Sequence, residues 1–132
     1  MRRAAKPLFD DRPLILLVED EVLLSDTVAD ELEDAGYRVI TSLTGEEGLT
    51  VLEGSEPIDL LFTDIRLPGF VDGWRLAEAA RSLRPGLPIV YATGHSIEKP
   101  RNVSRTRFIT KPYSPSTVVR AFEQLGVVGQ RG

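Results

Sequence analysis

Four polar side chains stand where short apolar runs of the sequence end. They are two carboxylates, a hydroxyl and an ammonium: Asp20, Asp64, Thr93 and Lys111. If the apolar runs are parallel strands of one sheet, these side chains meet at its carboxyl edge, where ligands bind in open α/β sheets. Carboxylates suit a hard divalent cation, whereas a hydroxyl and an ammonium suit phosphoryl oxygens. The set therefore predicts a site for a metal ion together with a phosphoryl group.

The apolar runs alternate along the chain with segments of helical character. Strands are expected at residues 14–18, 37–41, 58–63, 89–92 and 108–110. Four of the intervening or following segments carry helical stripes or capping signals: Leu24 to Ala35, Thr44 with Glu47, Trp74 to Leu83, and Ser114 with Pro115. Between residues 94 and 107 the pattern is weak and Pro100 interrupts it, so the fourth helix is expected to be short, broken or mobile.

This alternation predicts an α/β fold, a doubly wound five-stranded parallel sheet with helices on both faces. Five strands suit the flavodoxin-like order 2-1-3-4-5. Its switch point lies between the first and third strands, so Asp20 and Asp64 would face each other there. Residues 13–126 are expected to form the domain, with flexible tails at residues 1–12 and 127–132.

Length and composition exclude several classes of protein. A chain of 132 residues with 42% hydrophobic and 27% charged residues is typical of one globular domain, and no apolar stretch is long enough for a bilayer. The basic amino terminus leads into no apolar segment, so it does not resemble a signal peptide. The absence of cysteine fits a reducing cytoplasm, the expected location. A net charge of −4 argues against nucleic acid as a partner, and no membrane partner is expected.

Four motifs in this order resemble the receiver domain of bacterial two-component response regulators. They are Val18-Glu19-Asp20-Glu21, Asp64 followed by Leu67-Pro68-Gly69 and Asp72-Gly73, Ala92-Thr93-Gly94, and Lys111-Pro112. The resemblance spans residues 13 to 126, nearly the whole chain. The run Tyr91-Ala92-Thr93-Gly94 is similar to a receiver subgroup with Phe-Ala-Thr-Gly at the end of the fourth strand and a reduced fourth helix.

The resemblance implies a phosphoacceptor and a metal site. Asp64 would take a phosphoryl group from a phosphohistidine on a sensor histidine kinase or a histidine phosphotransfer protein. Asp20, Asp64 and the backbone carbonyl of Arg66 would ligate Mg²⁺, or Mn²⁺ in its place, and Glu19 would act through a bound water.

The same resemblance implies groups that bind the phosphoryl oxygens and respond to them. Thr93 would hydrogen-bond these oxygens and Lys111 would pair with them, and Lys111-Pro112 resembles a cis peptide of the family. Thr93 with either Phe108 or Tyr91 would form the switch, although plain core packing explains Phe108 equally well. The turn from residue 67 to 73 is one residue longer than the commonest receiver pattern, so the lip beside Asp64 is expected to differ in shape.

These inferences lead to a stand-alone phosphoacceptor switch that is read by an unknown downstream protein. It would not be an enzyme, although it would assist its own phosphorylation and dephosphorylation. The alternative is a protein-binding module that keeps the receiver fold but works without phosphorylation. A Mg²⁺-dependent hydrolase with an aspartyl nucleophile would need a second aspartate two residues after Asp64, where Arg66 stands.

Overall fold

A computed structural model describes residues 10–94 and 104–130 of the chain. Five parallel strands form one sheet in the order β2-β1-β3-β4-β5, which confirms the predicted flavodoxin-like order. The strands are β1 (Leu14–Val18), β2 (Arg38–Ser42), β3 (Leu60–Asp64), β4 (Ile89–Thr93) and β5 (Thr106–Thr110).

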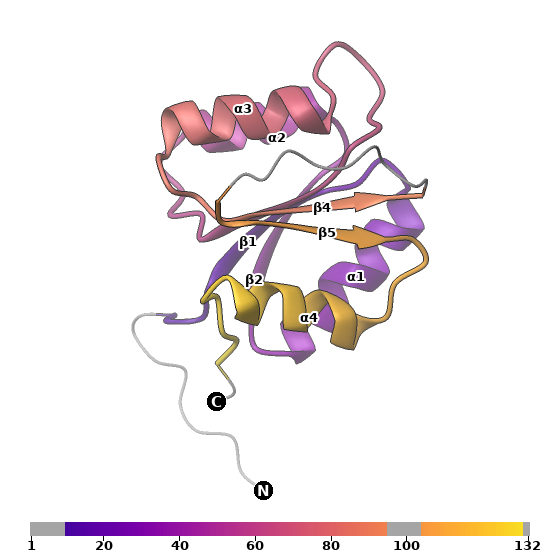
Figure 1. The fold of residues 1–132 in the computed structure, drawn as a ribbon, viewed down its shortest axis with the longest axis vertical. Helices are drawn as coiled ribbons and strands as arrows, with labels where there is room; N and C mark the ends of the chain where they lie inside the picture. Colours follow the sequence, from indigo (N-terminus) through magenta and orange to yellow (C-terminus); the bar gives the residue numbers. More distant parts are fainter. Residues whose placement is uncertain (1–9, 95–103, 131–132) are drawn as a thin grey trace, which may run out of the picture.

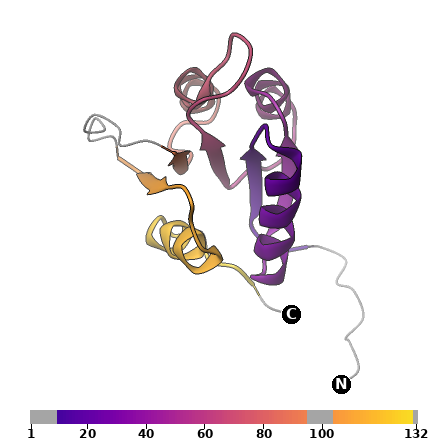
Figure 2. The ribbon, with the colours of Figure 1, turned by 90° about the vertical axis from the view of Figure 1, so that its right-hand side faces the viewer.

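Helices cover both faces of this sheet. They are α1 (Val22–Asp34), α2 (Gly45–Glu53), α3 (Gly73–Leu83) and α4 (Pro115–Gln124). Helices α1 and α4 lie on one face, and α2 and α3 lie on the other (Figures 1 and 2). The short or irregular helix predicted between the fourth and fifth strands falls mostly on residues 95–103, which lie outside the described residues. Among the helices described, none has the length and apolar character needed to cross a membrane.

The hydrophobic core forms one layer on each side of the sheet. Every residue of β1 and of β3 is buried, including the polar Thr63 and Asp64 at the end of β3. Successive side chains of a strand point to opposite faces, so Leu17 packs in the layer beneath α1 and α4, whereas Leu16 packs beneath α2 and α3. The first layer contains an edge-to-face contact between Tyr37 and Phe122, with ring centroids 5.4 Å apart.

Local capping residues explain where two of the helices begin. Ser114 caps α4 and Pro115 occupies the first turn, as the sequence predicts. The Thr44 hydroxyl accepts the N–H of Glu47 at 3.1 Å and so caps α2. The Glu47 carboxylate, however, accepts the N–H of Leu43 at 2.8 Å, one residue earlier than the usual capping box provides.

The residues after α4 turn back onto the domain. Gly126 has a φ of +85°, and the N–H of Val127 donates to the Phe122 carbonyl at 3.0 Å, which is the helix-ending pattern that favours glycine. Val127 is 7% exposed, and its carbonyl accepts a hydrogen bond from the Tyr37 hydroxyl at 2.7 Å. The Gln130 N–H also donates to a backbone carbonyl of the domain. The chain therefore does not leave the domain at residue 127, where a tail was expected.

The last residues before β1 also contact the domain. The Arg38 guanidinium on β2 donates to the carbonyl of Arg12 at 2.9 Å, and Arg12 forms an ion pair with Asp10 at 2.6 Å. Residues 1–9 of the tail predicted for residues 1–12 lie outside the described residues.

Candidate functional site

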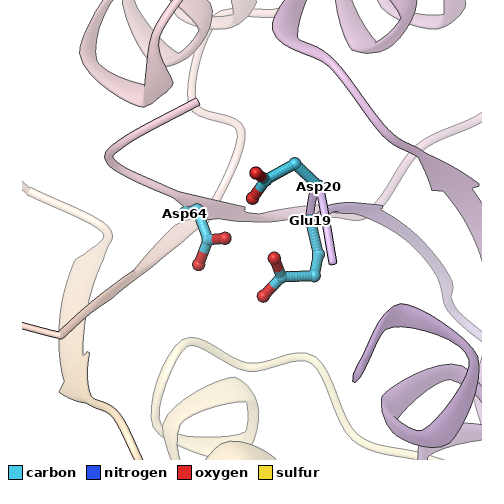
Figure 3. Close-up of side chains that lie close together, drawn as sticks. All are labelled: Glu19, Asp20 and Asp64. Atoms are coloured by element: carbon cyan, nitrogen blue, oxygen red, sulfur yellow. The ribbon is translucent and has the colours of Figure 1, made fainter. Parts of the chain in front are cut away.

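Three carboxylates gather at the carboxyl edge of the sheet. Glu19 and Asp20 directly follow β1, and Asp64 is the last residue of β3. Because Val18 of β1 is paired with Thr63 of β3, the next residues of both strands lie side by side. Figure 3 shows the side chains of Glu19, Asp20 and Asp64 converging, and each offers an oxygen within 4.8 Å of the others.

Two of these carboxylates are shielded from solvent and one is open. Glu19 is 2% exposed and Asp64 is 6% exposed, whereas Asp20 is exposed. The Glu19 carboxylate accepts the N–H of Glu21 at 3.0 Å, which fixes its orientation toward the cluster. The cluster therefore has a buried inner side and an outer ligand that solvent or a cation can reach.

Lys111 bridges the two buried carboxylates. Its ammonium lies 2.7 Å from Glu19 Oε1 and 2.9 Å from Asp64 Oδ1. The residue follows β5, where its N–H donates to the Thr93 carbonyl at 2.7 Å, and the Lys111–Pro112 peptide is cis. One ammonium thus faces two buried carboxyl groups, with a third carboxylate close by.

The electrostatics of this group favour the arrival of more positive charge. Burial and, second to it, the neighbouring Glu19 together raise the pKa of Asp64 to about 8, although Lys111 partly opposes this change. Burial alone would lower the pKa of Lys111, but its contacts with Glu19 and Asp64 outweigh that effect and raise it. The ammonium therefore stays charged and does not balance all the negative charge around it.

The donor set fits a hard divalent cation. Glu19, Asp20 and Asp64 offer oxygen ligands alone, and Mg²⁺ prefers such a shell while keeping several of its waters. A divalent cation would also offset the repulsion between clustered carboxylates. Arg66 is exposed and lies two residues after Asp64. Because Asp64 ends β3, the backbone of Arg66 lies at the same edge of the sheet.

Thr93 lies at the end of the neighbouring strand. Asp64 is paired with Ala92 in the β3–β4 ladder, so Thr93 stands one residue beyond the level of Asp64. Thr93 is half-buried, and its strand partner Thr110 immediately precedes Lys111. All four polar residues with which the sequence analysis began thus stand at the carboxyl ends of strands, on one edge of the sheet.

The two aromatic residues considered for the switch contact each other, and a third ring joins them. Tyr91 and Phe108 are paired across β4 and β5, and their rings stack at 4.9 Å with an interplanar angle of 21°. Trp74 of α3 contacts both rings, at centroid distances of 4.8 Å and 5.9 Å. The sequence analysis assigned Trp74 only to a helical stripe, because no local pattern links a helix start to two later strands.

The loop between β3 and α3 is closed at its base. The Gly73 N–H donates to the Ile65 carbonyl at 2.8 Å. A side chain at position 73 would clash with the carbonyl oxygen of Asp64, so glycine lets α3 begin directly against the phosphoacceptor candidate. Asp72 then caps α3 by accepting the Arg75 N–H at 2.9 Å. The backbone that follows Asp64 is therefore tied to the start of α3.

Comparison with known proteins gives consistent matches along the chain. The family model described as the response regulator receiver domain matches residues 15–123. The transcriptional regulatory protein GlrR of Escherichia coli (strain K12) is 32% identical over 114 residues, covering 83% of this chain and 25% of GlrR. The sensor histidine kinase RcsC of Salmonella typhimurium is 33% identical over 88 residues, covering 67% of this chain and 9% of RcsC.

A solved structure shares the fold over most of its length. A response regulator receiver protein from Sinorhizobium medicae has a TM-score of 0.79 and 31% identity, covering 87% of this chain and 94% of that one. The chain spans only a quarter of the length of GlrR, so the similarity to GlrR concerns one part of that regulator. That this chain acts as a stand-alone domain stays a prediction.

Proposed function

Because the chain belongs to the response regulator receiver domain family, we propose that it is a signalling switch controlled by phosphorylation of Asp64. Receiver domains are signalling domains rather than classical enzymes. The proposal rests above all on the environment of Asp64, a buried carboxylate 2.9 Å from the Lys111 ammonium and beside two further carboxylates. Such a set suits the capture of a phosphoryl group, since that chemistry needs positioning and charge compensation.

Four groups would hold Mg²⁺, or Mn²⁺ in its place. They are the carboxylates of Asp20 and Asp64, the backbone carbonyl of Arg66, and Glu19 through a water. When bound, the cation supplies positive charge between the carboxylates and the phosphoryl oxygens. The exposure of Asp20 supports this assignment, because an outer ligand must be reachable by the ion and its waters.

The phosphoryl group would come from a phosphohistidine of a sensor histidine kinase or a histidine phosphotransfer protein. The P–N bond to the imidazole breaks as a bond forms between phosphorus and an Asp64 carboxylate oxygen, and the imidazole leaves. Lys111 would pair with the phosphoryl oxygens, since its ammonium lies 2.9 Å from the Asp64 carboxylate that would carry them. Thr93, at the adjacent strand end, would donate its hydroxyl proton to them.

Phosphorylation would then change which surface the protein offers to a downstream protein. Lys111 and Thr93 are joined by a backbone hydrogen bond of 2.7 Å. Phe108, three residues before Lys111, stacks on Tyr91, two residues before Thr93. A shift of either phosphoryl-binding residue can therefore reach the aromatic rings through a short stretch of β4 or β5.

Phosphorylation with acetyl phosphate and Mg²⁺ tests the assignment. The wild-type protein should gain one phosphoryl group, detected by intact-protein mass spectrometry, and Asp64→Asn should gain none. Asp59→Asn is the matched control, because Asp59 precedes the same strand that Asp64 ends, and it should be labelled like the wild type. Labelling of Asp64→Asn would overturn the proposal.

A second measurement tests the switch itself. NMR spectra of the Mg²⁺-bound protein with and without beryllofluoride should differ at Thr93, Tyr91 and Phe108 as well as at Asp64. Changes confined to the residues beside Asp64 would favour a phosphoacceptor that does not act as a switch.

A further inference from the structure

Both backbone polar groups of Phe70 are bound by charged side chains from two different helices. The Phe70 N–H donates to the Glu46 carboxylate of α2 at 3.0 Å. The Phe70 carbonyl accepts from the Arg75 guanidinium of α3 at 3.1 Å. The Phe70 side chain is 86% exposed, so its own packing does not hold this residue in place.

The loop from residue 66 to 72 also lies directly against the start of α2. A side chain at Gly45, the first residue of α2, would clash with the backbone of Val71. Gly69 has a φ of +88°, and a Cβ atom there would come within 2.7 Å of the Glu46 carboxylate. The loop backbone is thus shaped to fit the first turn of α2, and Glu46 is its polar contact there.

This loop matters because of what it connects. It starts two residues after Asp64, and its first residue is Arg66, whose carbonyl is assigned to the cation. It also overlaps the turn, residues 67 to 73, that the sequence analysis predicts to be one residue longer than the commonest receiver pattern. An extra residue gives a loop more conformations, and two charged contacts on one residue restrict them.

We propose that Glu46 and Arg75 are positioning residues that hold this loop in the shape required for cation binding beside Asp64. The inference rests on the proposed function, since it concerns the same cation site. Both side chains form hydrogen bonds with the backbone of Phe70, so each would act on the cation site through that residue.

Glu47 provides a matched control for Glu46. Both glutamates lie in the first turn of α2, so both interact favourably with that end of the helix. Glu47, however, binds the N–H of Leu43 and not the loop. An effect found with Glu46→Ala and absent from Glu47→Ala therefore belongs to the loop contact and not to the helix.

The test compares Mg²⁺ binding by the full chain carrying Glu46→Ala, Glu46→Gln, Arg75→Met or Glu47→Ala. Trp74, the single tryptophan, lies just after the loop and reports binding by its fluorescence. Losing one hydrogen bond to a charged group should weaken Mg²⁺ affinity about fivefold in Glu46→Ala, with a change in the same direction in Arg75→Met. Glu46→Gln keeps an acceptor oxygen and should restore the affinity, and Glu47→Ala should leave it unchanged.

Amide hydrogen exchange supplies a readout that does not depend on the metal. In the metal-free protein the Phe70 N–H should exchange faster in Glu46→Ala than in the wild type or in Glu46→Gln. Wild-type Mg²⁺ affinity in Glu46→Ala would overturn the inference, as would a Glu46→Gln variant that binds as weakly as Glu46→Ala. A wild-type protein that acetyl phosphate does not label would instead overturn the proposed function, so the two failures are distinguishable.

Discussion

Strand β3 has an aspartate at each end, and the two have opposite surroundings. Asp59 comes immediately before the strand and is exposed, and its carboxylate accepts the N–H of Leu14 at 2.7 Å. Asp64 ends the strand at 6% exposure, next to Glu19, with Lys111 as its cationic partner. One carboxylate stays in water and satisfies a backbone donor, whereas the other is buried beside a second negative charge.

This contrast extends to the two edges of the sheet. At the amino edge, arginines bind backbone carbonyls: Arg84 donates to Leu52, Gly54 and Glu56, and Arg81 donates to Leu87, Ser104 and Arg105. At the carboxyl edge, charged side chains face one another. We infer that the amino edge contributes stability and that the carboxyl edge gives up some stability for the chemistry of the site.

The largest effect on stability is expected at the amino edge, from Arg84→Ala. Four hydrogen bonds from this guanidinium join the end of α2 and the turn that follows it to the turn before β4. Their loss should lower the free energy of unfolding by about 3 kcal/mol, measured by urea denaturation. Arg84→Lys should recover only a small part, because an ammonium is a point donor that lacks the planar five-donor fork with which the guanidinium reaches these separate carbonyls. The folded fraction of Arg84→Ala should still be labelled by acetyl phosphate. Loss of labelling would contradict the inference that the amino edge contributes stability while the carboxyl edge carries the chemistry.

At the carboxyl edge, by contrast, Asp64→Asn is expected to raise the free energy of unfolding. Burial and Glu19 raise the pKa of Asp64 from 3.8 to about 8, so the folded protein loses stability as the pH rises from about 4 toward 8. Asparagine cannot ionise and avoids this loss. In EDTA at pH 8 the variant should therefore be more stable than the wild type by about 2 kcal/mol, with little difference at pH 4. An equal gain in stability at pH 4 and at pH 8 would show that ionisation of Asp64 is not the cause.

Removing the bridging cation should give a smaller change in stability and a larger one in metal binding. Lys111→Met leaves Glu19 and Asp64 without their ammonium, but protonation of Asp64 limits the cost to about 1 kcal/mol in EDTA at pH 7. Because the ammonium and a divalent cation repel each other, Mg²⁺ should bind the variant more tightly than the wild type. Isothermal titration would test this, and weaker binding would show that Lys111 organises the carboxylates instead.

Much of this arrangement could be predicted from the sequence because it depends on strand ends. Buried strands are continuous apolar runs, and a parallel sheet places the residues that follow them on one edge, so Asp64 and Lys111 could be brought together without coordinates. The course of the chain after α4 was less well predicted. Val127 follows Gly126 in a helix-ending motif that returns the chain to the core, but the short polar sequence after it is typical of a tail.

Contacts between distant segments could not be predicted in this way. Glu46 and Phe70 are 24 residues apart and meet because the loop after β3 folds onto a neighbouring helix. Trp74 meets Tyr91 and Phe108 for a similar reason, since the packing of α3 on the sheet sets which rings touch. Periodicity identifies a helix and its buried face, but it does not give the rotation and height at which that helix packs.

The smallest effect is expected from Asp59→Asn, which makes the same substitution as Asp64→Asn at the other end of β3. The amide oxygen still accepts the Leu14 N–H, but a neutral acceptor binds more weakly than a carboxylate, so the free energy of unfolding should fall by about 0.5 kcal/mol. The chain carries a net charge of −4, so removing any carboxylate could stabilise it by reducing overall repulsion. Urea denaturation of both variants in EDTA at pH 8 separates the two explanations. If Asp59→Asn stabilised the protein as much as Asp64→Asn, net charge would explain both results, and the cost assigned to burying Asp64 beside Glu19 would be wrong.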